Sequence, residues 1–139
     1  MAASSSGTAV EAGKLLVRLT LGVLILFHGI SKVVGGAAMI VGLVEKAGLP
    51  APFGYLVYVG EVLAPLLLIA GLWTRAAAAI VAINMVVAVY LVHLGDLFSM
   101  SKSGGWALEL QGFYLFIALA VMLLGAGRFS IGGAGGRLN

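Results

Sequence analysis

Four apolar segments, each about as long as a lipid bilayer is thick, constrain this chain more than any other feature. They cover residues 14–34, 54–72, 76–94 and 106–125. A helix needs about 20 mainly apolar residues to cross the hydrocarbon layer, so four such segments take up most of the 139 residues. The sequence therefore predicts an all-α fold, an integral membrane four-helix transmembrane bundle, and leaves no length for a soluble catalytic domain.

The composition agrees with a membrane protein and excludes several other classes. Hydrophobic residues make up 62% of the chain and charged residues 9%, whereas about a quarter of a soluble domain is charged. The net charge of +3 comes from single Lys and Arg residues without a basic patch, so we expect lipid and no nucleic acid as a partner. The absence of cysteine excludes disulfides and iron–sulfur ligation by thiolates.

The flanking segments complete the predicted organisation. Residues 1–13 are small and polar and predict a disordered lead-in, residues 14–126 form the membrane domain, and residues 127–139 form a fraying tail. The 35–53 connection contains "MIVGLVEKAG", which predicts a short amphipathic helix at the interface. A cleaved signal peptide is disfavoured because Lys32 lies between the apolar stretch and the small residues after it.

The basic residues predict the orientation, because Lys and Arg are retained on the cytoplasmic side. Five of them belong to the side shared by both termini, and three to the opposite side: Lys14, Arg18, Arg75, Arg128 and Arg137 against Lys32, Lys46 and Lys102. This bias predicts both termini in the cytoplasm.

Several polar side chains fall at similar depths in the outer half of the predicted bundle. An ionisable residue at the centre of a membrane helix costs about 2.5–3.5 kcal/mol on insertion scales, so such residues usually face the bundle interior. Counted at about 1.5 Å per residue, His28 and Glu61 lie at the same level. His93 and Glu109 lie somewhat further out. Lys32 follows His28 by one helical turn.

Helical angles decide which of these residues share a face. Arg18, Gly22, Gly29 and Lys32 form one stripe of the first helix, where the glycines allow a close helix contact. On the second helix Glu61 shares a face with Pro65, which is expected to kink that helix.

In the third and fourth segments the angles separate polar pairs. Asn84 and His93 point to opposite sides, as do Glu109 and Gln111. We expect His93 and Glu109 inside the pocket, and Gln111 and Asn84 toward interfacial water or a neighbouring subunit.

Three ligand classes fit this predicted pocket. For a quinone-type head group, His28 or Lys32 donates to a carbonyl oxygen and Glu61 accepts or relays the proton, which makes His28 and Glu61 the catalytic candidates. The predicted cofactor-binding residues are Lys32, Tyr58, His93, Glu109 and Phe113, with Phe27 and Trp106 as further aromatic walls.

The alternatives are a metal ion and a haem. The metal ion would be held by His28, Glu61, His93 and Glu109, and the haem by His28 and His93, but the sequence has no diagnostic ligand spacing for either. A purely structural polar network is the competing interpretation.

The sequence resembles the DoxX family of small four-helix membrane proteins from Leu15 to Ile131. The resemblance rests on "LLVRLTLGVLILFHGISKV", "KAGLPAP", Glu61, "GLWTRAAA", His93, Glu109 and "GAGRFSI". It implies a multi-pass protein of the bacterial cytoplasmic membrane and a link to oxidoreductase systems, because relatives include a subunit of a thiosulfate:quinone oxidoreductase. Ala64-Pro65 departs from relatives, which often have glycine there.

Three functions remain open from the sequence. The first is a redox-linked membrane subunit that binds quinone and works with a partner oxidoreductase, since the chain has no obvious electron carrier of its own. The second is a non-catalytic scaffold or anchor subunit of a larger membrane complex, which the alanines at 76–79 favour. A transporter, acting as a homo-oligomer, is disfavoured because four spans lack paired broken helices.

Overall fold

The computed structural model describes residues 2–139, with side chains from residue 7 onward. The regular elements of this described part are helical, and the only other pairing in it is an isolated bridge between Met100 and Trp106. The elements are α1 (Ala2–Gly35), α2 (Ala38–Lys46), η1 (Ala51–Leu56), η2 (Val59–Leu63), α3 (Ala64–Ala70), α4 (Thr74–Val92), η3 (Leu94–Asp96) and α5 (Glu109–Leu124). The predicted all-α class is confirmed.

Helix α1 is longer at its start than the sequence predicts. It begins at Ala2 and includes the residues expected to form a disordered lead-in, apart from Met1, which lies outside the described residues. Contacts with the end of the chain explain the difference. Glu11 accepts hydrogen bonds from Lys14 Nζ at 2.7 Å and from the backbone N–H of Arg128 at 2.6 Å, so the helical extension is fixed to the tail.

The second apolar segment, Ala51–Ala70, combines η1, η2 and α3 and is apolar and long enough to cross a membrane. Its irregularity follows from Pro65, which has no N–H to donate to the carbonyl of Glu61 one turn earlier. The N–H of Ala64 instead bonds the carbonyl of Val59, five residues back, which is the π-helical pattern. Where the sequence predicts a kink at Pro65, the structure has a widened turn before it, and this turn contains Glu61.

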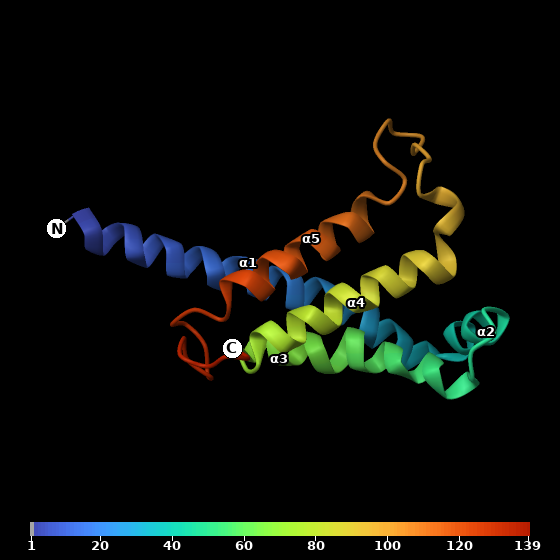
Figure 1. Cartoon of the computed structure of the whole chain (residues 1–139), viewed down its shortest axis with the longest axis horizontal. Helices are drawn as coiled ribbons and strands as arrows, with labels where there is room; N and C mark the ends of the chain where they lie inside the picture. Colours follow the sequence, from blue (N-terminus) through green and yellow to red (C-terminus); the bar gives the residue numbers. More distant parts are fainter. Residues whose placement is uncertain (1) are drawn as a thin grey trace.

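Helices α1, α3, α4 and α5 pack around one apolar core. Its buried residues come from all four helices: Leu21, Ile25, Ala64, Leu68, Ala77, Ala78, Val81, Ala82, Met85, Tyr114, Ala118 and Val121. Gly71, with φ +70°, and Trp73, with φ 45°, make the tight turn between α3 and α4. Figure 1 shows the C-terminus beside this turn, at the end of the bundle from which the N-terminus extends, and α2 at the other end.

Length and composition allow two or three membrane crossings. Ala51–Ala70 and Thr74–Val92 each suffice, and α1 with α2 forms a third candidate that is bent by 97°. Helix α5, the predicted fourth span, has 16 residues, or about 24 Å, which is shorter than a hydrocarbon layer of about 30 Å.

The C-terminal tail is irregular, but it packs against the bundle where the sequence predicts fraying. The carbonyl of Leu138 accepts a hydrogen bond from the N–H of Arg75 at 2.8 Å, and Asn139 Oδ1 accepts one from the N–H of Thr74 at 3.1 Å. The first N–H groups of a helix have no partner within it. The tail supplies such partners to α4, which explains why it is ordered.

Candidate functional site

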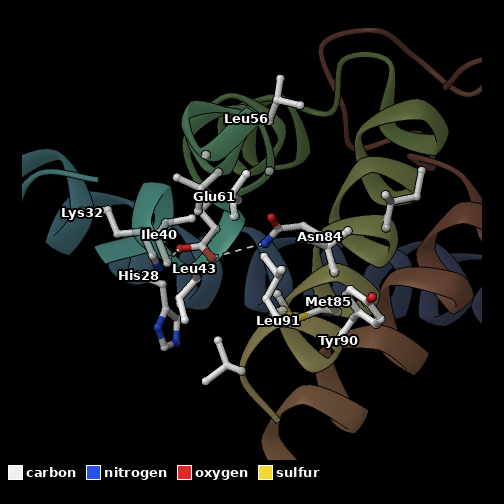
Figure 2. A pocket seen from close by; sticks show the side chains of 18 of the residues that line it. His28, Lys32, Ile40, Leu43, Leu56, Glu61, Asn84, Met85, Tyr90 and Leu91 are labelled. Atoms are coloured by element: carbon white, nitrogen blue, oxygen red, sulfur yellow. Dashed lines mark hydrogen bonds and ion pairs between the residues drawn. The ribbon is translucent and has the colours of Figure 1, made fainter. Parts of the chain in front are cut away.

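A cavity of about 620 Å³ lies among α1, α2, η1, η2, α4 and the start of α5 (Figure 2). Its walls are mainly apolar. A few polar side chains from separate elements also line it: His28, Lys32, Glu61, Asn84, Tyr90, His93, Gln111 and Tyr114. Apolar walls with few convergent polar groups, in a cavity of about 300–1,000 Å³, are typical of small-molecule sites.

Glu61 is the buried charged residue of this cavity, with 7% of its surface exposed. One carboxylate oxygen forms an ion pair with Lys32 Nζ, and the other accepts a hydrogen bond from Asn84 Nδ2 at 3.2 Å. Figure 2 shows the carboxylate between these two side chains, which come from α1 and α4. We call Lys32, Glu61 and Asn84 the polar centre.

Two glycines allow the helices to approach closely at the polar centre. A Cβ at Gly29 of α1 would lie 2.6 Å from the carbonyl carbon of Glu61, and a Cβ at Gly60 would lie 2.6 Å from Cγ of Asn84. Either methyl group would overlap its neighbour, since carbon atoms in contact lie about 3.5–4.0 Å apart. The glycine stripe predicted on the first helix therefore brings Lys32 within reach of Glu61.

Tyr58 strengthens the same helix contact. Its hydroxyl donates a hydrogen bond to the carbonyl of Lys32 at 3.0 Å. Tyr58 is not among the residues lining the cavity. The sequence predicts that it contacts the ligand, whereas the structure places it beside the polar centre.

His28 lines the cavity together with Glu61. The imidazole projects away from the carboxylate (Figure 2) and contacts the ring of Tyr114 edge-on, with centroids 5.9 Å apart. Within the described residues, no hydrogen bond to the imidazole nitrogens of His28 is found. The two residues thus share a cavity without bonding each other, and both imidazole nitrogens can bond a ligand.

His93 and Gln111 form a second polar pair in the cavity lining, with Nε2 of each 3.2 Å apart. The other imidazole nitrogen of His93 lies 3.2 Å from Oδ2 of Asp96. His93 follows the last residue of α4 and has φ −121°. The helical angle that separates it from Asn84 therefore does not apply, and both residues line the cavity.

Glu109 and Phe113, which the sequence places in the site, are not among the residues that line the cavity. Glu109 and Phe113 do share a face of α5, but this face points outward, and Phe113 is 65% exposed. Gln111 lies one turn before the buried Tyr114 and shares its inward face. Asn84 and Gln111, expected outside, both line the cavity. Phe27 and Trp106, expected as aromatic walls, also lie outside the lining, where Phe53, Tyr90 and Tyr114 stand instead.

The predicted metal ligands do not converge. In the part of the chain that the structure describes, no group of three or more His, Cys, Asp or Glu side chains is arranged to hold a metal ion. Glu109 lies outside the cavity, and His93 pairs with Gln111 and Asp96. The predicted metal ligands are therefore not assembled in the described residues, whereas the mainly apolar cavity suits an organic ligand. The two predicted haem ligands, His28 and His93, both line the cavity.

Arg18 is buried but lies away from this cavity. Nη1 donates to the carbonyls of Leu68 and Ile69 at 2.7 and 3.1 Å, and Nη2 donates to the carbonyl of Phe129 at 2.6 Å. The last carbonyls of a helix lack partners within it. Arg18 therefore caps α3 and holds the tail, and its role is structural.

Apolar helices of spanning length around a core and a mainly apolar cavity define a helical membrane protein with a candidate ligand site. The DoxX family model matches residues 13–94, more than half of the chain. The chain belongs to the DoxX family, as the resemblance in its sequence predicts. Searches of curated proteins and of solved structures found no match.

Proposed function

We propose that this DoxX protein is a redox-linked subunit of the bacterial cytoplasmic membrane that binds a quinone-type head group in its cavity and works with a partner oxidoreductase. The observation that carries the proposal is the buried carboxylate of Glu61, held by Lys32 and Asn84 at the wall of an otherwise apolar cavity. Both termini lie on the cytoplasmic side in this proposal, and the polar centre lies in the outer half of the membrane.

The polar centre suits a neutral ring that carries oxygen atoms. Lys32 has N–H donors beyond the one directed at Glu61, and His28 has two free imidazole nitrogens in the described part of the chain. Reduction of a quinone consumes protons, which a carboxylate and an imidazole can supply or relay. Glu61 and His28 are the proposed proton-handling residues, and Lys32 and Asn84 position the carboxylate.

In this proposal the electrons come from a partner or from a bound cofactor, because the chain has no cysteine and, among its described residues, no group of three or more metal-ligating side chains. The alternative, a non-catalytic anchor subunit, draws less support from the small residues than the sequence implies. Ala77 and Ala78 are completely buried in the chain's own core, and Gly22 and Gly29 pack against α3 and η2. These residues are therefore not free for contacts with another subunit.

Quinone binding in lipid nanodiscs tests the proposal. A naphthoquinone with a decyl tail is titrated onto wild-type protein and onto Glu61→Gln and His28→Ala variants. Glu61→Gln is expected to weaken binding about tenfold or more, because the carboxylate that orders Lys32 and Asn84 is lost. Glu109→Gln is the matched control and is expected to bind as wild type, since Glu109 is exposed and outside the cavity.

Equal affinities of Glu61→Gln and Glu109→Gln would contradict the proposed site. Isolation in mild detergent with mass spectrometry of bound proteins tests the partner. Stable co-purification with a membrane complex, without quinone binding by the wild-type chain, would favour the anchor subunit.

A further inference from the structure

The cavity has a polar and an apolar part. Glu61 is buried in the polar part. The apolar part is lined by exposed side chains on two sides. One side consists of Met39 of α2, which is 72% exposed, with Phe53 and Leu56 of η1. The other side consists of Ile83 of α4, which is 63% exposed, and Val87 of the same helix. We call these five residues the rim. The rim is the exposed apolar edge through which the cavity meets its surroundings.

The height of the rim places it within the hydrocarbon layer. Ile83 lies near the middle of the 19-residue helix α4, one of the helices long and apolar enough to cross a membrane. The middle of such a helix lies near the middle of a hydrocarbon layer about 30 Å thick. The part of the rim on α4 therefore faces lipid chains and not water.

The charges in the cavity select the kind of molecule that can enter. Of the described lining residues, Lys32 and Glu61 carry the opposite formal charges, and they pair with each other. An ionic ligand would lose its hydration without gaining a counter-charge, which is strongly unfavourable. A neutral ligand with hydrogen-bonding atoms keeps the ion pair intact and gains partners at Lys32, His28 and Asn84.

Resting on the function proposed above, we propose that the cavity opens sideways to the hydrocarbon layer between α2–η1 and α4. Its ligand is an uncharged amphiphile that enters from the bilayer. The head group reaches the polar centre, and the apolar tail lies along the rim. Helix α2 forms one wall of this opening. It is bent by 97° from α1 after Gly36, and its residues Ile40, Leu43 and Val44 line the cavity.

The absence of cysteine allows a clean chemical test of the rim. Val87→Cys introduces one thiol at the rim, and Leu123→Cys introduces one at a residue that is 72% exposed but outside the lining. Each variant is modified in mild detergent with a trimethylammonium-carrying methanethiosulfonate or with methyl methanethiosulfonate, complete modification is checked by intact mass, and the protein is then transferred to phosphatidylcholine nanodiscs. Binding of the decyl-tailed naphthoquinone and of tailless naphthoquinone is then measured.

The charged adduct at Val87→Cys is expected to weaken binding of the tailed quinone about tenfold or more, since it puts a charge in the path of the tail. The methyl adduct at Val87→Cys and both adducts at Leu123→Cys are expected to change the affinity for the tailed quinone less than about twofold. The tailed quinone is expected to bind more tightly than the tailless one.

Tight binding of the tailed quinone that is insensitive to charge at Val87→Cys would overturn the sideways opening while leaving the proposed function intact. The same holds if the tailed and tailless quinones bind equally, which is the result expected if a phospholipid chain fills the rim. Binding of neither quinone by any unmodified variant would overturn the proposed function and this inference together.

Discussion

Replacing Gly29 by alanine tests how the chain assembles the polar centre. The new Cβ would lie 2.6 Å from the carbonyl carbon of Glu61 and 2.8 Å from Cγ2 of Val62. Carbon atoms in contact need about 3.5 Å, and the carbonyl oxygen of Glu61 lies closer still to the new Cβ, so α1 and η2 have to separate by more than about 0.9 Å. Overpacking of this kind costs about 1–3 kcal/mol, and here it acts on backbone atoms that cannot rotate away.

The matched control is the same substitution at Gly13, also within α1, where nothing lies within 4 Å of the new Cβ. Alanine is favoured over glycine inside a helix by about 0.5–1 kcal/mol, so Gly13→Ala is expected to stabilise the chain slightly. Both variants gain this helix propensity, so they should differ by the overpacking cost of about 1–3 kcal/mol, with Gly29→Ala the less stable of the two.

The assay is unfolding of each variant in mild-detergent micelles with increasing SDS, followed by the fluorescence of Trp73 and Trp106. Gly29→Ala should also weaken quinone binding, because Lys32 moves away from Glu61. Equal stability of Gly29→Ala and Gly13→Ala would refute the close contact of α1 with η2.

Two further substitutions probe the cap and the amide. Arg18→Met is expected to lower the free energy of unfolding by at least about 3 kcal/mol, because the carbonyls of Leu68 and Phe129 lose a charged donor. SDS unfolding measures this change, and a loss no larger than that of the exposed Arg137→Met would contradict the cap. Asn84→Leu removes the second donor to Glu61. It is expected to lower the free energy of unfolding by about 1–2 kcal/mol and to weaken quinone binding several-fold. Unchanged binding would show that the amide does not position the carboxylate.

Regular helical periodicity made part of this structure predictable. The stripe from Arg18 to Lys32 lies within one continuous helix, so an angle of about 100° per residue describes it well. That stripe meets the face of the second segment that carries Glu61, as its position in the sequence indicates. The shared cavity of His28 and Glu61 follows from the same count.

The errors lie where regular periodicity ends or where a face has two possible directions. His93 lies past the end of α4, so the helical angle that relates it to Asn84 does not apply to it. On α5 the separation of Glu109 from Gln111 is correct, but hydropathy alone could not decide which of two apolar faces turns inward. Membrane helices are apolar on the lipid side as well, which removes the usual signal.

Long-range contacts were beyond sequence reasoning for a different reason. Arg75 Nη1 donates to the carbonyls of Met122 and Leu123 at the end of α5, as Arg18 does for α3. In the sequence both arginines indicate only the cytoplasmic side. Their use as caps, and the packing of the tail over the α3–α4 turn, depend on which helix ends meet in space.

The central claim is that Lys32 and Glu61 form one paired unit inside the bundle, and a double-mutant cycle tests it most directly. Lys32→Met, Glu61→Gln and the double variant are unfolded with SDS, and the cycle of Lys32→Met with Glu109→Gln serves as the control. We predict a coupling energy of about 1–3 kcal/mol for Lys32 with Glu61 and additivity for Lys32 with Glu109. Additive effects of Lys32→Met and Glu61→Gln, within about 0.5 kcal/mol, would contradict the pair and the site built on it.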